Sequence, residues 1–128
     1  MVNATKKILV VEDDKALREV IVGNLKKKNY EIVEANDGEA GIAMVLDEKP
    51  KLVLLDLLLP KLDGFKVLER IRHYPDKNIA ETKVVVLSNL YSDKDILRAQ
   101  ALKVDEYYAK ANTDLNVVFQ KIDQIMAG

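Results

Sequence analysis

The sequence contains no cysteine and no tryptophan, and phenylalanine and tyrosine bring its aromatic content to only 5%. Without cysteine, the chain forms no disulfide, no thiolate metal site and no thiol nucleophile. An excess of either charge is also missing, because 20 Lys and Arg stand against 21 Asp and Glu. Binding to nucleic acid or to an anionic membrane surface usually needs a basic patch, so we expect neither as a direct partner.

Long hydrophobic runs are absent as well. No apolar run approaches the roughly 18 residues of a membrane-spanning helix, and the start of the chain has a four-residue apolar run followed by acids, unlike a signal peptide. The 128 residues and the hydrophobic content of 48% are those of one globular domain. We therefore expect a single cytoplasmic domain over residues 1–128, with its core at about residues 6–126 and no effector domain.

Short apolar runs predict the strands. Residues 8–11, 52–55 and 84–87 have no polar alternate face, which is typical of strands in a parallel sheet covered by helices on both sides. Residues 31–35 alternate between polar and apolar side chains and predict a less buried strand near an edge of the sheet. Residues 106–109 are a weaker fifth candidate.

Helix-period patterns lie between and after these strands, over about residues 14–28, 36–48, 65–74, 92–102 and 115–126. Asn36 is the expected N-cap of the second helix, because Glu39 follows three residues later, and Ser92 is the expected N-cap of the fourth. Strand and helix patterns alternate five times. The sequence therefore predicts an α/β fold, a doubly wound (βα)5 three-layer sandwich with a five-stranded parallel sheet.

Polar side chains follow four of the predicted strands. Glu12 and Asp13 come after the first strand, Asp56 after the third, Ser88 after the fourth and Lys110 after the fifth. Because the carboxyl ends of parallel strands meet at one edge of the sheet, we expect these side chains to lie together. Three carboxylates in one place repel unless a cation compensates, and oxygen ligands without His or Cys suit Mg²⁺.

A carboxylate can also attack phosphorus, and a nearby ammonium and hydroxyl can then neutralise and bind the phosphoryl oxygens. Each acid also has a simpler structural interpretation when it is considered alone. Asp13 or Asp14 could cap the first helix, and Asp63 could serve a turn with the glycine that follows it. Asp56 closes an apolar run and needs a partner if it is buried. His73, the one histidine, lies at a predicted helix end and is interpreted as a solvated partner of the helix dipole.

Two segments resemble a known family. Residues 8–14, ILVVEDD, and residues 52–64, LVLLDLLLPKLDG, resemble the receiver domain of two-component response regulators, of the chemotaxis-type single-domain kind. The resemblance covers about residues 6–126 and implies a flavodoxin-like fold. It implies that Asp56 is the phosphoacceptor, and that Glu12, Asp13, Asp56 and the backbone carbonyl of Leu58 hold Mg²⁺.

The same resemblance implies a signalling mechanism rather than turnover of a substrate. A sensor histidine kinase, a phosphotransfer protein or a small acyl phosphate would phosphorylate Asp56, and Lys110 would contact the phosphate. Ser88 and Tyr107 occupy the switch positions and would reshape the face made by the fourth helix, fifth strand and fifth helix, where a downstream protein binds. The chain itself would be no enzyme beyond accepting phosphoryl and slowly losing it.

The chain departs from the family pattern at three positions. Ala111 follows Lys110 where the family usually has a proline, so we expect a trans peptide and a different local loop, on which the placement of Lys110 and the shape of the partner face depend. Asn89 stands where a small residue is usual, next to the expected phosphoryl group. Lys103 replaces a frequent glycine, which suggests a different turn before the fifth strand.

Leu58 and Leu90 stand two residues after Asp56 and Ser88, and neither can orient an attacking water by hydrogen bonding. We therefore predict a long-lived phosphoryl-aspartate. Three other classes of protein share parts of this pattern. A haloacid-dehalogenase-like phosphatase needs a second Asp at the position of Leu58, and a flavodoxin-like cofactor binder needs a phosphate loop that is missing after the first strand. A receiver-like adaptor that works without phosphorylation stays open because of Ala111.

Overall fold

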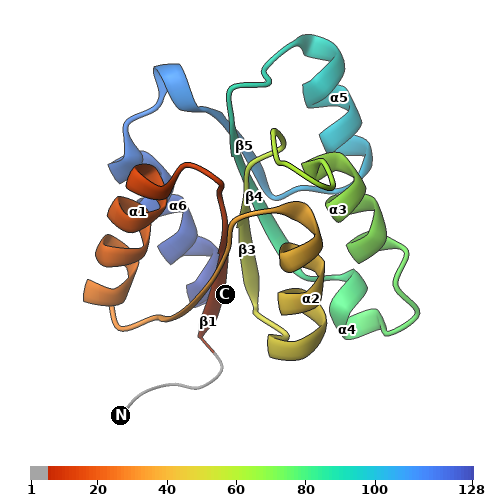
Figure 1. Ribbon diagram of the computed structural model, residues 1–128. Coiled ribbons are helices and arrows are strands. Elements are labelled where there is room, and N and C mark those ends of the chain that lie inside the picture. Colours follow the sequence, from red (N-terminus) through yellow and green to blue (C-terminus); the bar gives the residue numbers. More distant parts are fainter. Residues whose placement is uncertain (1–5) are drawn as a thin grey trace.

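A computed structural model describes residues 6–128. Its five strands form one parallel sheet with the order β2-β1-β3-β4-β5 (Figure 1). The strands are β1 Lys7–Val11, β2 Glu31–Ala35, β3 Leu52–Leu55, β4 Lys83–Ser88 and β5 Glu106–Ala109. The helices are α1 Lys15–Lys27, α2 Gly38–Glu48, α3 Gly64–Arg72, α4 Lys77–Ala80, α5 Asp93–Ala101 and α6 Leu115–Ala127, and a 3-10 helix covers Lys110–Asn112.

The helices form two layers around the sheet. In Figure 1, α1 and α6 lie on one side of the strands, and α2, α3 and α5 lie on the other side. Each layer has its own apolar core, because successive side chains of a strand point to opposite faces. Ile8 and Val10 of β1 pack with α1 and α6, whereas Leu9 and Val11 pack with α2, α3 and α5. The predicted doubly wound α/β sandwich is therefore confirmed.

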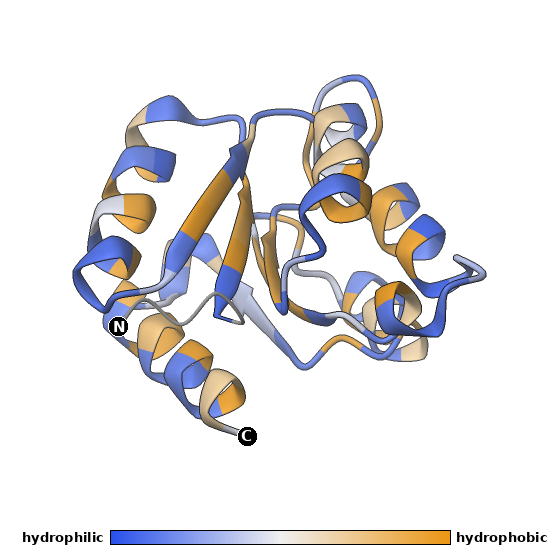
Figure 2. Ribbon diagram, turned by 90° about the horizontal axis from the view of Figure 1, so that it is seen from below, coloured by the Kyte–Doolittle hydropathy of each residue, from blue (hydrophilic) through white to orange (hydrophobic). Residues whose placement is uncertain are grey.

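The central strands are buried on both faces, as their apolar runs predict. All four residues of β3 are buried, and so are four of the five residues of β1. The edge strand β2 buries only Ala35 fully, which agrees with its alternating sequence. Figure 2 shows that the central strands are largely hydrophobic, while the surrounding helices carry both kinds of residue.

The start of α2 differs by one residue from the prediction. Asp37, and not Asn36, is the N-cap, and its carboxylate accepts a hydrogen bond from the backbone N–H of Ala40 at 2.8 Å. The next backbone N–H, that of Gly38, donates to the carbonyl of Pro60 at 3.3 Å. This contact with a distant loop sets where the helix begins. The prediction for Ser92 is confirmed, since it caps α5 with a full capping box.

Two glycines allow the loop that follows β3 to fold back tightly. A Cβ at Gly38 would lie 1.8 Å from the carbonyl oxygen of Leu62, and a Cβ at Gly64 would lie 2.4 Å from that of Asp56. The N–H of Gly64 donates to the carbonyl of Leu57 at 2.9 Å. Only residues without a side chain fit these approaches, which hold the backbone around Asp56 in place.

Arg72, the last residue of α3, joins segments that are distant in the sequence. Its guanidinium donates to four backbone carbonyls, those of Leu102 at 2.7 Å, Ala80 at 2.9 Å, Thr82 at 2.7 Å and Lys103 at 3.1 Å. The sequence did not predict this role, nor the short helix α4. Both depend on contacts between α3, the start of β4 and the end of α5.

Within residues 6–128, no helix has both the length and the apolar content to cross a lipid bilayer.

Candidate metal centre

Three carboxylates meet at the carboxyl ends of β1 and β3, which lie toward the top of Figure 1. Glu12, Asp13 and Asp56 each offer an oxygen, and these oxygens lie within 4.8 Å of one another. The strand register places them there, because Val11 pairs with Leu55 and the N–H of Asp56 donates to the carbonyl of Val11 at 3.1 Å. Glu12 and Asp56 are only 2% and 4% exposed, while Asp13 is exposed.

Lys110 lies between the two buried carboxylates. Its ammonium contacts Asp56 Oδ2 at 2.6 Å and Glu12 Oε1 at 2.7 Å. Burial disfavours the charged ammonium, but the hydrogen bonds with Asp56 and Glu12 outweigh burial and raise the pKa of Lys110. The peptide before Ala111 is trans, as predicted, because residues 6–128 contain no cis peptide. Lys110 contacts both carboxylates with Ala111 after it, and a 3-10 helix begins at Lys110.

Backbone donors hold the two buried carboxylates from the other side. The N–H of Asp14 donates to Glu12 Oε2 at 3.1 Å, and the N–H of Leu58 donates to Asp56 Oδ1 at 3.0 Å. Burial raises the pKa of Glu12, and the hydrogen bonds from Lys110 and Asp14 oppose this shift. Each buried carboxylate therefore has one backbone donor and shares one ammonium, and its remaining lone pairs are open to another cation.

The predicted switch residues, Ser88 and Tyr107, meet at Leu90. Ser88 is fully buried, and its Oγ accepts a hydrogen bond from the N–H of Leu90 at 3.2 Å. The Tyr107 hydroxyl donates to the carbonyl of Leu90, and its ring packs edge-on against Tyr91 with centroids 5.6 Å apart. Burial, followed by the charges of Asp95 and Asp56, raises the pKa of Tyr107 to about 12. Among the described residues, neither switch residue forms a hydrogen bond with Asp56.

The remaining predicted positions have varied surroundings. Leu58 is 49% exposed beside the carboxylates, Leu90 is partly buried, and Asn89 is exposed. Lys103 has a φ of 59°, the left-handed conformation that glycine adopts most easily. Lys103 therefore takes a backbone conformation suited to glycine, the residue that is frequent at this position in the family.

Two of the other acids have structural roles, Asp14 as the predicted helix cap and Asp63 as a helix cap where a turn was predicted. Asp14 caps α1 by accepting from the N–H of Leu17 at 3.1 Å, and Asp63 caps α3 by accepting from the N–H of Lys66 at 3.1 Å. Asp13 caps no helix and stays with the carboxylate cluster. His73 is the exposed C-cap residue of α3, in agreement with its predicted place at a helix end.

One residue next to the carboxylates was missed by the sequence interpretation. Arg18 of α1 donates from Nη1 to the carbonyl oxygen of Glu12 at 2.8 Å and from Nε to Glu34 Oε1 at 3.1 Å. It belongs to none of the motifs that the sequence analysis singled out. A pairing between α1 and β2 could have been suspected from Glu34, the acid near the end of the edge strand.

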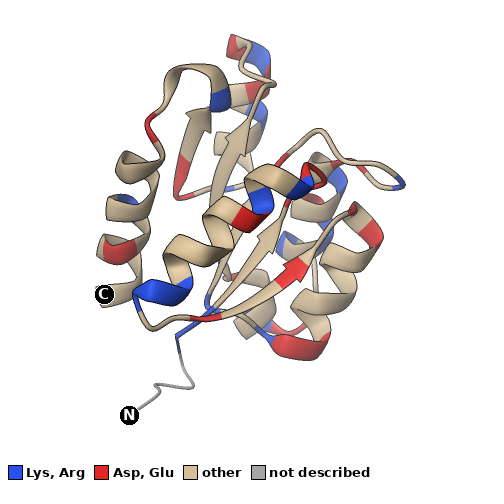
Figure 3. Ribbon diagram, turned by 60° about the vertical axis from the view of Figure 1, so that its left-hand side comes forward, with Lys and Arg blue, Asp and Glu red and all other residues tan. Residues whose placement is uncertain are grey.

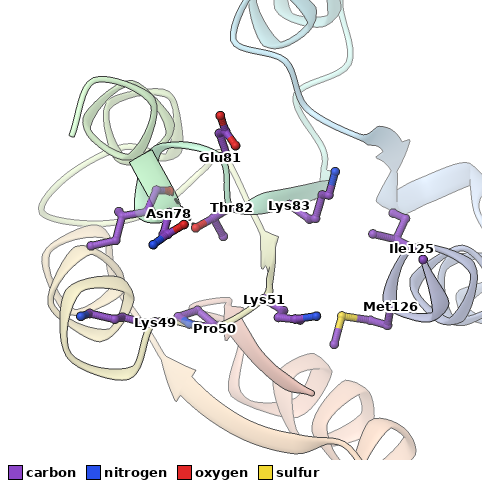
Figure 4. Close-up of a pocket in the computed structure, with 11 residues that line it drawn as sticks. Lys49, Pro50, Lys51, Asn78, Glu81, Thr82, Lys83, Ile125 and Met126 are labelled. Carbon is purple, nitrogen blue, oxygen red and sulfur yellow. Dashed lines mark hydrogen bonds between the residues drawn. The ribbon is translucent and has the colours of Figure 1, made fainter. Parts of the chain in front are cut away.

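A cavity of about 310 Å³ lies at the opposite end of the sheet (Figure 4). It is lined by residues that precede β3 and β4 and by the end of α6. Its lysines do not converge on one point, since the side chains of Lys49 and Lys51 extend in opposite directions in Figure 4. The carboxylate cluster thus remains the site where reactive groups are gathered.

The donor set of the cluster fits a hard divalent cation. All the ligands on offer are oxygens, and three carboxylates face the single ammonium of Lys110. Such ligands are the ones that Mg²⁺ prefers, usually together with water and phosphate oxygens.

A parallel sheet of this order, with an acidic cluster and a lysine at its carboxyl edge, is the arrangement of a receiver domain. Residues 8–123 match the family model described as the response regulator receiver domain. The chain therefore belongs to this family, whose members are signal-transduction modules of two-component systems. The family resemblance of the segments around Glu12 and Asp56 is therefore confirmed.

Individual relatives agree with this assignment. The chain is 35% identical over 104 residues to the DNA-binding dual master transcriptional regulator RpaA of Synechocystis sp., and the match covers 81% of this chain and 42% of RpaA. It thus spans less than half the length of the curated relatives that it matches.

Two solved response regulators are similar in both sequence and structure. The Mn²⁺-bound form of response regulator Rcp1 is 33% identical, with a TM-score of 0.78 and coverage of 94% of this chain and 91% of that one. The phosphorylated cyanobacterial phytochrome response regulator RcpA is 35% identical, with a TM-score of 0.76 and coverage of 94% and 90%.

Proposed function

We propose that Asp56 accepts a phosphoryl group from a sensor histidine kinase or a phosphotransfer protein, and that this reaction depends on Mg²⁺. The observation that carries the proposal is the position of Lys110, whose ammonium contacts both Asp56 and Glu12, two carboxylates that are only 4% and 2% exposed. The cluster has more negative than positive charge, so it can accept a divalent cation. Glu12, Asp13, Asp56 and the backbone carbonyl of Leu58 are the proposed ligands.

The chemical step forms a bond between a carboxylate oxygen of Asp56 and phosphorus and breaks the phosphorus–nitrogen bond of a phosphohistidine. Lys110 neutralises charge on the transferred group and Ser88 donates a hydrogen bond to it, so the barrier falls mainly through electrostatic stabilisation. Bound Mg²⁺ would supply further positive charge at the phosphoryl oxygens. The chain acts as an acceptor that loses its phosphoryl group slowly, and not as an enzyme with turnover.

The signal passes through Leu90, because Ser88 and Tyr107 both bond to its backbone. A Ser88 hydroxyl that turns toward a phosphoryl group must change its contact with the Leu90 N–H, and the Tyr107 side chain is then free to follow. The affected surface is the face of α5, β5 and α6, the fourth helix, fifth strand and fifth helix of the sequence prediction. Leu97 lies on this face and is 65% exposed, and Tyr91 lies next to the face and is 49% exposed. Both side chains can bind a downstream protein.

The proposed output is contact with a protein, without direct binding of nucleic acid or membrane by these residues. The DNA binding in the name of RpaA belongs to a longer protein, of which this chain matches 42%. A kinase of the proposed kind presents its phosphohistidine in the cytoplasm, so we place the chain there.

The adaptor alternative, which needs no phosphorylation, rests on the altered step from Lys110 to Ala111. The contacts of Lys110 at 2.6 and 2.7 Å give that alternative no support.

The test is phosphorylation of the purified chain by acetyl phosphate with Mg²⁺, followed by intact mass, with beryllofluoride as a second probe followed by NMR. We expect the parent to gain one phosphoryl group and Asp56→Ala to gain none. Asp47→Ala removes an exposed aspartate of α2 and should behave like the parent. A parent that shows neither a mass gain nor a spectral change would overturn the proposal.

A further inference from the structure

The three carboxylates of the cluster are held unequally. Glu12 and Asp56 each accept a backbone N–H and contact Lys110. Asp13 is exposed, and its side chain forms no hydrogen bond or ion pair with any residue in the described part of the chain. The position of its carboxylate is therefore set by the backbone that carries it.

Arg18 fixes that backbone. Its Nη1 donates to the carbonyl oxygen of Glu12 at 2.8 Å, and this carbonyl belongs to the peptide unit that joins Glu12 to Asp13. A peptide unit is planar, so a hydrogen bond to its oxygen also fixes the direction in which the Cα of Asp13 leaves it. The link between Arg18 and the Cα that carries the exposed carboxylate is therefore a single rigid group.

The Arg18 side chain is itself held in place by β2. Its Nε contacts Glu34 Oε1 at 3.1 Å, and the side chain is only 15% exposed. On the other side, the N–H of Glu12 donates to the carbonyl of Ala35 at 3.0 Å. Figure 3 shows α1, with basic and acidic residues, beside β2 with its acidic residues, and the two elements are in contact. The planar fork of arginine can bind a carbonyl and a carboxylate at once, which a lysine ammonium does less well.

We propose that Arg18 is a positioning residue of the metal site, which aims the Asp13 carboxylate through the Glu12 carbonyl and is held by Glu34. This inference rests on the metal site of the proposed function. The inference also predicts that removing Arg18 lowers the affinity for Mg²⁺, which is the opposite of what its charge alone would give. Arg18 is a cation near a cation site, so its charge alone opposes Mg²⁺ binding and its removal would strengthen binding. Loss of positioning weakens binding instead.

The experiment is titration of the full chain with Mg²⁺, followed by calorimetry or NMR shifts of the residues after β1 and β3. Arg18→Gln should weaken Mg²⁺ binding by about tenfold, the usual scale for removing a group that orients a ligand. Glu34→Gln should weaken it by a smaller factor. Lys15→Gln, which removes an exposed cation of the same helix without touching the Glu12 carbonyl, should leave the affinity equal or slightly higher.

A double-mutant cycle separates positioning from a general loss of stability. If Arg18 acts through Asp13, Arg18→Gln should have little further effect in an Asp13→Asn background. Urea unfolding of each variant gives its stability separately. Equal or tighter Mg²⁺ binding by Arg18→Gln, or full additivity with Asp13→Asn, would overturn the inference while the proposed function stands. A parent that does not bind Mg²⁺ overturns both.

Discussion

The two ends of the sheet carry different polar residues on the same strands. On each of the three central strands, a lysine precedes a run of four apolar residues and an acid or a hydroxyl follows it. The pairs are Lys7 and Glu12 on β1, Lys51 and Asp56 on β3, and Lys83 and Ser88 on β4. The lysines lie at the amino edge of the sheet, and the acids and the serine lie at its carboxyl edge.

The difference between the two edges is burial. Glu12, Asp56 and Ser88 are at most 4% exposed, whereas the side chains of Lys7 and Lys83 are 20% and 58% exposed. A solvated lysine needs no partner, but a buried carboxylate must be compensated by hydrogen bonds and by a cation. An exposed lysine of the amino edge such as Lys83 should therefore tolerate substitution, while the buried groups of the carboxyl edge depend on one another.

The sharpest test compares one lysine from each edge. Lys110→Met leaves Glu12 and Asp56 buried without their cation and should lower the free energy of unfolding by about 3 kcal/mol at neutral pH. Lys83→Met removes a lysine whose contact with Asp105 is 4.0 Å long, and should change stability by less than about 0.5 kcal/mol. Urea unfolding measures both, and similar losses for the two variants would show that the edges do not differ.

The second test concerns reactivity at the carboxyl edge. Leu58→Asn places a hydrogen-bonding group two residues after Asp56, where it can orient a water toward the phosphoryl group. We expect the phosphoryl-aspartate to decay about tenfold faster than in the parent. Leu97→Asn, at a leucine that is 65% exposed on α5, is the control and should decay like the parent. Unchanged decay in Leu58→Asn would contradict the predicted long lifetime.

The third test uses pH at the amino edge. Burial disfavours ionised Asp123, but hydrogen bonds from Tyr30 at 2.6 Å and Lys28 at 2.9 Å outweigh it and hold the pKa of Asp123 below its usual value. A lowered pKa in the folded state stabilises the protein above the unfolded pKa of about 3.9, and this contribution disappears as the pH falls through the folded value.

Asp123→Asn should therefore cost about 1 kcal/mol at pH 7, a modest value because the Asp123 side chain is 40% exposed. The difference from the parent should be smaller at about pH 3, below the unfolded pKa, than at pH 7. Urea unfolding at the two pH values measures it, and Tyr30→Phe should reproduce part of the loss at pH 7. A difference that stays constant with pH would mean that the ionised carboxylate is not the cause.

The smallest effect is expected at Lys103, which precedes β5 at the amino edge. The left-handed backbone at Lys103 costs a residue with a side chain about 1 kcal/mol, and Lys103→Gly removes this cost. Glycine also raises the conformational entropy of the unfolded chain, which offsets part of the gain. A net gain of about 0.5 kcal/mol in thermal or urea unfolding is expected. Gln100→Gly, within helix α5, should instead destabilise the protein by about 1 kcal/mol.

The sequence predicted most of the fold because the signals were local. The apolar runs of β1, β3 and β4 determine which strands are central, and Ser92 carries its own capping box. Asn36 and Asp37 are chemically alike, and the choice between them depends on the contact of Gly38 with Pro60, which no local pattern contains.

The candidate site was predicted where side chains follow strands, and missed where a helix contacts a loop. Glu12, Asp56 and Lys110 converge because parallel strands bring their carboxyl ends together. Arg18 could not be found this way, since its partners are a backbone carbonyl and a strand residue 16 positions away.

The four carbonyls bound by Arg72 have a mechanical consequence for α5. Leu102 and Lys103, directly after the last turn of α5, are fixed to α3, and Arg98 stacks on Phe65 at 4.1 Å. The first turn is held mainly by its own capping box, and Ala99 is the one fully buried residue of the helix. The helix is roughly 13 Å long, and it can tilt about its carboxyl end, where it is held. A tilt of about 10° would leave Leu102 almost still and carry the first turn by roughly 2 Å.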